Sequence, residues 1–221
     1  MNDCSLYFQM GLEHITDLNG LDHILFIIAL CIRYVPQNWK KILLLITAFT
    51  VGHSLTLALS TFNIISIPQQ YTEFCIALTI VITAISNCLV KDFSFRSRYP
   101  AIYFITLFFG LIHGMGFSSM LKSILGKGQN ILPQLFSFNI GLEAGQLIIV
   151  SAVMIIIFIF VKLLRFNRQY LLLFVSGGIA AIALQMAIER YPFTNKHVDE
   201  KTAFLPANNN MYCCIKCSGH S

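Results

Sequence analysis

The residues of this chain that could do chemistry are histidines and acids placed within long apolar segments. Ionisable side chains inside a membrane-spanning segment cost about 2.5–3.5 kcal/mol each on insertion scales, so they mark functional sites. Imidazole and carboxylate groups together are ligands for borderline divalent metals such as nickel, cobalt or zinc. The sequence therefore predicts an intramembrane metal site formed by His14, Asp22, His23, His53, His113 and Glu143.

Further polar residues in the apolar segments would support this site. Asn139, Glu143 and Gln146 are spaced at i, i+4 and i+7, which places them on one face of a helix. Ser54 follows His53, but neighbouring helical residues point about 100° apart, so we expect its hydroxyl to bond its own backbone rather than to act as a nucleophile. Glu73 begins another apolar segment, where it would serve as a further carboxylate or as an interfacial anchor.

Two glycine pairs lie around polar residues of this set. Each pair has the Gly-x-x-x-Gly spacing that lets helix backbones approach closely in lipid. We therefore predict helix-packing positions at Gly110 and Gly114, on either side of His113, and at Gly141 and Gly145, on either side of Glu143.

The composition identifies the elements that must position these residues. The chain has 221 residues, of which 56% are hydrophobic and 11% charged, against about 25% charged in an average soluble domain. A water-soluble globule could not bury so much apolar surface, and the same composition excludes disorder. The net charge is +5, but the basic residues are scattered between apolar runs, which excludes nucleic-acid binding.

What remains is an all-α polytopic membrane protein, a bundle of about six transmembrane helices. The charge-free stretches are long enough for helices of about 20 residues, and no period-2 alternation suggests strands. We expect an outer segment over 1–19, a transmembrane domain over 20–190 and a polar tail over 191–221. The spans are predicted near 20–36, 41–60, 72–90, 99–121, 133–161 and 169–189.

The basic residues predict the orientation, because cytoplasmic loops carry an excess of lysine and arginine. Loops after the odd-numbered spans hold nine such residues and the opposite side holds six, which predicts that both termini lie outside. In that orientation His53, His113 and Glu143 lie roughly 10–15 Å below the outer surface. We expect one cavity, open to the outside and lined by the first, second, fourth and fifth spans, with the third span as a further candidate. The nine are Arg33, Lys40, Lys41, Lys91, Arg96, Arg98, Lys162, Arg165 and Arg168; the six are Lys122, Lys127, Arg190, Lys196, Lys201 and Lys216.

Four ordered motifs resemble the HupE/UreJ family, membrane proteins accessory to hydrogenase and urease. The similarity extends from about residue 11 to residue 147, and the segment YTEFCIALTIVITAISN fits the same pattern. The motifs are GLEHITDLNGLDHILFIIAL, TAFTVGHSLTLAL, FGLIHGMGFS and FNIGLEAGQL.

This resemblance implies a permease for nickel or cobalt in the lipid bilayer, which we expect to be the bacterial inner membrane. The family's first motif places a histidine before an Asp-His pair, which corresponds to His14, Asp22 and His23, and its second His-Gly motif falls on His113. Better-studied nickel permeases of this type carry a glutamate soon after the second motif. This chain does not, and Glu143 would replace it.

The residues also allow other functions. A zinc ion in the same cluster would make the protein an intramembrane hydrolase, with Asp22 or Glu143 as the base. A non-transporting accessory protein would use the histidines only structurally, and homo-oligomerisation stays open. The tail carries a ligand-like Cys-x-x-Cys-x-x-His pattern, for which disorder or disulfides are the favoured interpretation; its residues are Cys213, Cys214, Cys217 and His220.

Overall fold

The computed structural model describes residues 3–18, 20–34, 38–89, 101–124 and 131–192. These residues are helical and contain no β-strand, which confirms the predicted all-α class. The helices are α1 (Asp3–Thr16), α2 (Leu21–Cys31), α3 (Trp39–Thr61), α4 (Gln69–Cys88), α5 (Ala101–Ile124), α6 (Ile131–Phe158), the π-helix η2 (Ile159–Leu163) and α7 (Arg168–Glu189).

Most of these helices match the spans predicted from hydropathy. Within the described residues, four are long and apolar enough to cross a membrane: α3, α4, α6 continued by η2, and α7. Helices α1 and α2 form a pair bent by 68°, which would be a fifth span if the pair crosses as one. Helix α5 contains a shorter apolar stretch, Ile102–Ser118. The length and apolar composition of these helices indicate an integral membrane protein.

Local sequence sets where the helices begin. Asn167 caps α7, because its side-chain oxygen accepts a hydrogen bond from the backbone N–H of Gln169 at 2.9 Å. Pro68 precedes α4 with an extended backbone, and proline cannot donate the hydrogen bond that would continue a helix backwards. Asn167 and Pro68 thus mark the starts of two of the helices.

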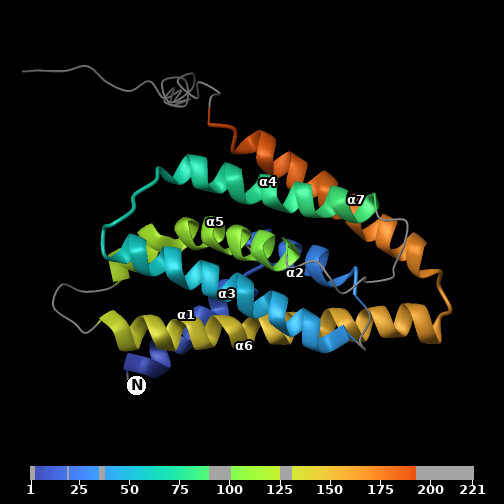
Figure 1. The fold of residues 1–221 in the computed structure, drawn as a ribbon, viewed down its shortest axis with the longest axis horizontal. Coiled ribbons are helices and arrows are strands. Elements are labelled where there is room, and N and C mark those ends of the chain that lie inside the picture. The colour runs from blue at the N-terminus through green and yellow to red at the C-terminus, as the bar shows by residue number, and fades with distance from the viewer. Residues whose placement is uncertain (1–2, 19, 35–37, 90–100, 125–130, 193–221) are drawn as a thin grey trace, which may run out of the picture.

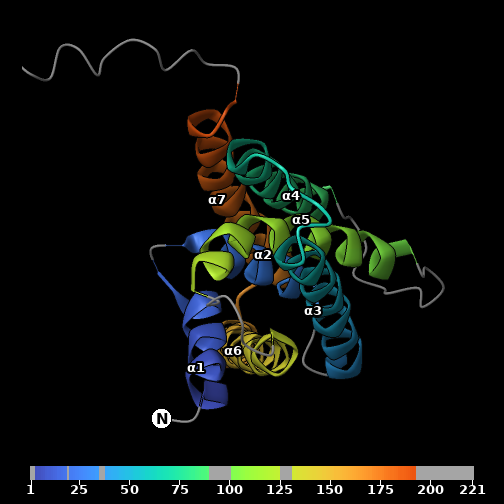
Figure 2. The same ribbon diagram turned by 90° about the vertical axis from the view of Figure 1, so that its left-hand side faces the viewer.

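The helices pack as three pairs with α2 among them. Helices α4 and α7 lie at one side of the molecule, α1 and α6 at the opposite side, and α2, α3 and α5 between them (Figures 1 and 2). The most extensive helix contacts are those of α3 with α5, α1 with α6 and α4 with α7. Residues 3–16, which the sequence suggests are an outer leading segment, therefore form a helix of the bundle.

Two of these pairs are held by glycines that touch the backbone of the partner helix. A Cβ atom on Gly52 would collide with the carbonyl oxygen of Leu107, and one on Gly110 with that of Phe49. The same close approach joins α1 and α6, where Gly11 meets Phe138 and Gly141 meets Phe8. Along α5, Gly110 and then Gly114 meet the carbonyl oxygens of Phe49 and then His53, and along α6, Gly141 and then Gly145 meet those of Phe8 and then Leu12, so the paired helices run parallel. Such contact is the use of glycine that the Gly-x-x-x-Gly spacing predicts.

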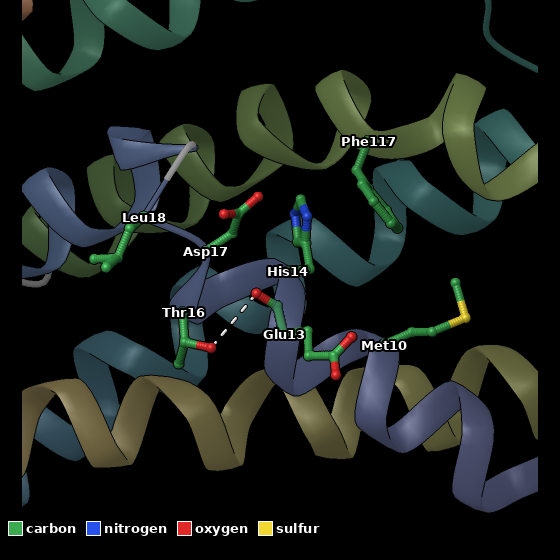
Figure 3. A pocket seen from close by; sticks show the side chains of 7 residues that line it. All are labelled: Met10, Glu13, His14, Thr16, Asp17, Leu18 and Phe117. Atoms are coloured by element: carbon green, nitrogen blue, oxygen red, sulfur yellow. Dashed lines mark hydrogen bonds between the residues drawn. The ribbon is translucent and has the colours of Figure 1, made fainter.

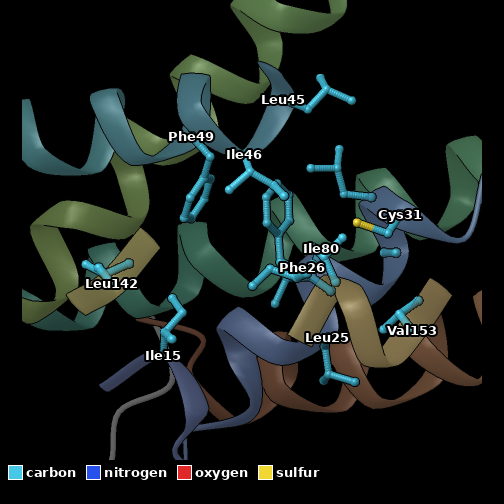
Figure 4. Close-up of a cluster of buried hydrophobic side chains, with 14 of the residues drawn as sticks. Ile15, Leu25, Phe26, Cys31, Leu45, Ile46, Phe49, Ile80, Leu142 and Val153 are labelled. Carbon is cyan, nitrogen blue, oxygen red and sulfur yellow. The ribbon is translucent and has the colours of Figure 1, made fainter. Parts of the chain in front are cut away.

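The apolar core connects the pairs at the centre of the bundle. Figure 4 shows side chains from α1, α2, α3, α4 and α6 meeting in one cluster. Phe26 of α2 stacks on Phe49 of α3 with ring centroids 5.0 Å apart, and both side chains are almost fully buried. Large apolar side chains on the outer faces of α6 and α7 remain exposed, as lipid-facing positions require.

We predict that alanine at Gly110 lowers the stability of the bundle. The added methyl group would meet backbone rather than a flexible side chain, and overpacking of this kind costs about 1–3 kcal/mol. Thermal unfolding of the detergent-solubilised protein measures the effect. Gly177→Ala in α7 is the matched control, because no atom lies within 4 Å of its added Cβ. Equal stability of the two variants would contradict the proposed backbone contact.

Candidate metal site

Four histidines from four helices meet in the centre of the bundle. His14 lies near the end of α1, His23 near the start of α2, His53 in α3 and His113 in α5. His53 and His113 are fully buried, and His23 is 7% exposed. The break between α1 and α2 brings His14 and His23 together although they belong to different helices.

The imidazole rings are close enough to share one ion. Ring centroids are separated by 4.7 Å for His14–His23, 5.2 Å for His23–His113, 5.8 Å for His23–His53 and 6.1 Å for His14–His53. A histidine nitrogen binds zinc or a similar ion at about 2.0–2.1 Å, which places the centroids of two ligand rings about 5 Å apart. The observed centroid separations of the four rings lie close to that value.

Most of the ring nitrogens in this cluster have no hydrogen-bond partner. They are Nε2 of His14 and of His23, both nitrogens of His53, and Nδ1 of His113. A buried polar atom without a partner costs about 1–3 kcal/mol, and an apolar membrane interior makes it no cheaper. A cation held by these nitrogens would remove that cost. In this arrangement no three His, Cys, Asp or Glu side chains of the described residues are placed to hold a metal ion.

A threonine of α4 determines which nitrogen of His113 is available. Thr79 donates its single hydroxyl proton to the carbonyl oxygen of Ile76 at 2.7 Å. Its oxygen, 3.0 Å from Nε2 of His113, must then accept a proton from that nitrogen. In this tautomer Nδ1, which has no hydrogen-bond partner, carries a free lone pair. Hydrogen bonds of this kind orient metal-binding histidines in proteins.

Phenylalanine rings surround the cluster and keep it apolar. Phe49 lies 5.2 Å from His113 and 6.0 Å from His53, and Phe26 lies 5.1 Å from His113 between ring centroids. On the other side Phe117 lies 3.9 Å from His14 and is stacked on a further phenylalanine, Phe138. Electrostatic interactions inside such a water-poor shell are stronger than at a surface.

One pocket leads to the cluster from the end of α1. Its volume is about 690 Å³, and it is lined by Met10, Glu13, His14, Thr16, Asp17, Leu18 and Phe117. Figure 3 shows the His14 ring pointing toward α5 beside Phe117, with Asp17 close to it. The carboxylates of Glu13 and Asp17 are exposed, whereas His14 is partly buried, so the pocket has an acidic mouth and a histidine at its inner side. Glu13 was not predicted from the sequence, although it stands one residue before His14.

The two acids predicted as ligands have other partners in the structure. Both oxygens of Asp22 lie 3.0 Å from the same guanidinium nitrogen of Arg190, at the end of α7. Glu143 accepts a hydrogen bond from Thr47 of α3 at 3.3 Å. The structure therefore brings the four histidines together and sets these carboxylates beside the cluster rather than among the rings.

The supporting residues lie in several places. Gln146 contacts Thr50 of α3, whereas Glu73 is exposed and accepts a hydrogen bond from Gln69. Ser54 donates to the carbonyl oxygen of Thr50 at 2.7 Å, the backbone interaction favoured by the sequence. Asn139 has a buried side-chain oxygen with no partner.

The glycine beside His113, Gly114, packs against the His53 backbone, and Gly145 packs against the Ile15 side chain. The cysteines of the tail, Cys213, Cys214 and Cys217, and His220 lie outside the described residues.

Comparison with family profiles gives a match over most of the chain. A family profile described as HupE / UreJ protein matches residues 1–190. The chain belongs to the HupE/UreJ family. The match covers all four histidines, Asp22, Glu143 and the helix pairs that position them. Comparison with curated proteins gave no match, and comparison with solved structures gave none either.

We predict that Thr79→Val weakens metal binding by this HupE/UreJ protein about 10–100-fold, as loss of a histidine's outer hydrogen bond typically does. The valine cannot accept the Nε2 proton, so His113 loses the contact that fixes its tautomer. Equilibrium titration of the purified protein with Co²⁺ or Ni²⁺ measures the affinity. Thr83→Val is the control, because the Thr83 hydroxyl bonds the backbone of its own helix. An unchanged affinity in Thr79→Val would refute the role of this hydrogen bond.

Proposed function

We propose that the protein is a permease for a divalent transition metal, nickel or cobalt, in the bacterial inner membrane. The observation that carries the proposal is the meeting of four imidazoles from four helices, three of them buried and that of His14 partly buried, with five ring nitrogens that lack a partner. Neutral imidazole is a preferred ligand of such metals. Membership of the HupE/UreJ family agrees with a metal-related role in transport or as an accessory protein.

Each part of the site has a task in this function. Glu13 and Asp17 attract the hydrated cation to the pocket, where His14 is the first imidazole it meets. His14 lies 4.7 Å from His23, so the ion can pass between them while it exchanges water for nitrogen ligands. His53 and His113 complete the set within the apolar shell. Phe117 lies at the contact between pocket and cluster, where it limits the passage of water.

The discontinuous helix at α1 and α2 suits a transporter. Broken helices in transporters place their ends at the substrate site near the middle of the membrane, and movement of one bundle against another then opens the site to either side. Here His14 and His23 stand on either side of the 68° bend, and the other two histidines belong to the glycine-packed α3 and α5. The cluster thus joins two packed units, α1 with α6 and α3 with α5.

Metal uptake tests the proposal directly. Expressed in a urease or hydrogenase host kept short of nickel, the protein should raise accumulation of labelled Ni²⁺ or Co²⁺ above the vector control. The variants His23→Ala and His113→Ala should reduce uptake to the vector level, because each removes a central imidazole. Wild-type protein that is present in the membrane yet gives no uptake would reject transport.

We predict that the double variant Glu13→Gln, Asp17→Asn raises the KM for metal uptake several-fold and leaves the maximal rate nearly unchanged. Both carboxylates are exposed at the mouth of the pocket, where they raise the local cation concentration without binding the ion in the cluster. The difference from wild type should shrink at high ionic strength, because salt screens exposed charges. A change in maximal rate alone would argue against this role. Glu189→Gln, at the end of α7, is the matched control.

A further inference from the structure

A second polar group lies at the interface of α3 and α6, next to the histidine cluster. Thr47 of α3 donates a hydrogen bond to Glu143 of α6, and Thr50, one turn further along α3, lies 2.7 Å from the side-chain oxygen of Gln146. None of these side chains is an imidazole, so the group offers a cation only oxygen ligands and amide dipoles. Neither the aromatic shell nor the pocket includes it.

The Gln146 side chain is buried with one of its polar atoms unpaired. Gln146 is 1% exposed, and its Nε2 atom has no hydrogen-bond partner. Thr50 has a single proton but two acceptors, the carbonyl oxygen of Ile46 at 3.1 Å and the Gln146 oxygen at 2.7 Å. If the amide turns by 180°, Thr50 donates to Ile46 and accepts from Gln146. The amide oxygen then becomes the unpaired atom, a neutral ligand for a cation.

Glu143 has a neutral partner although it carries a carboxylate. Glu143 accepts a hydrogen bond from the Thr47 hydroxyl, and the salt bridge between Arg190 and Asp22 does not involve it. The lysines of α3, Lys40 and Lys41, lie at the start of that helix. A half-buried carboxylate in a membrane bundle is therefore left without a compensating positive charge, which a passing dication would supply.

The position of the group relates it to the cluster. Thr50 and Thr47 precede His53 by three and six residues, so they lie roughly 4.5 and 9 Å from it along the α3 axis, toward the start of the helix. The orientation predicted from the basic residues makes that start the cytoplasmic end. The oxygen group is then the next polar position after the histidines on the path of an inward-moving ion.

We propose that Glu143 and Gln146, with Thr47 and Thr50, form a second cation site that receives the metal from the histidine cluster and releases it toward the cytoplasm; this inference depends on the proposed transport function. Oxygen ligands hold nickel and cobalt less tightly than imidazole does, and conduction requires sites weak enough for the ion to leave. Transfer from nitrogen to oxygen ligands therefore favours release.

The test separates binding in the cluster from turnover. The purified full chain is titrated with Co²⁺ in detergent, where visible absorption reports histidine ligation, and Co²⁺ uptake is measured in proteoliposomes. Glu143→Gln should keep the Co²⁺ spectrum and a KM within about threefold of wild type, while kcat falls at least tenfold. Glu73→Gln is the matched control, because the same chemical change is made at an exposed glutamate, and its kinetics should match those of wild type.

A second variant keeps the proposal testable if Glu143→Gln does not fold. Gln146→Leu removes the amide at similar volume and should give the same split between kcat and KM, so it replaces Glu143→Gln if that protein is not recovered. A wild-type kcat in these variants overturns the second site, and so does loss of the Co²⁺ spectrum, because Glu143 would then belong to the histidine site. Wild-type protein that neither binds nor transports Co²⁺ overturns the proposed function itself.

Discussion

Close contact between helix backbones is the constraint on which the rest of this structure depends. In α3 with α5, and in α1 with α6, glycines take positions where any side chain would strike the carbonyl of the partner helix. Gly114 packs against the backbone of His53, while His113 is its direct neighbour in sequence. Since the two helices approach so closely, imidazoles from both reach the same small volume. A wider helix separation would leave each ring among apolar side chains of its own helix.

The histidine rings are polar groups enclosed at the centre of an apolar bundle. The rings are enclosed by phenylalanines, and within the described residues only His113 has a fixed hydrogen bond, to Thr79. Ring nitrogens without hydrogen-bond partners raise the free energy of a packed interior unless a bound group satisfies them. The acids are distributed around the rings instead. Asp22 is paired with Arg190, whereas Glu143 accepts a hydrogen bond from the neutral hydroxyl of Thr47.

Much of the fold could be predicted from the sequence, because hydropathy in a membrane protein depends on local composition. The limits of α3, α4 and α7 fall within three residues of the predicted spans. The exception is α1: residues 3–16 are only moderately apolar, and their helix packs on α6 through Gly11, a contact between distant residues that no local pattern reveals. The pocket could not be predicted for the same reason, because Glu13 lines it only when α1 packs into the bundle.

For the candidate site, residue type alone predicted the four histidines that the structure brings together, since an ionisable group in an apolar span requires a partner or a function. The sequence could not determine which of its candidates share a centre. Helical periodicity gives the face on which a residue lies, but the partner of that face depends on how helices cross. Tertiary packing therefore decided that His14 joins the other rings, that Asp22 pairs with Arg190, and that Thr79 directs the proton of His113.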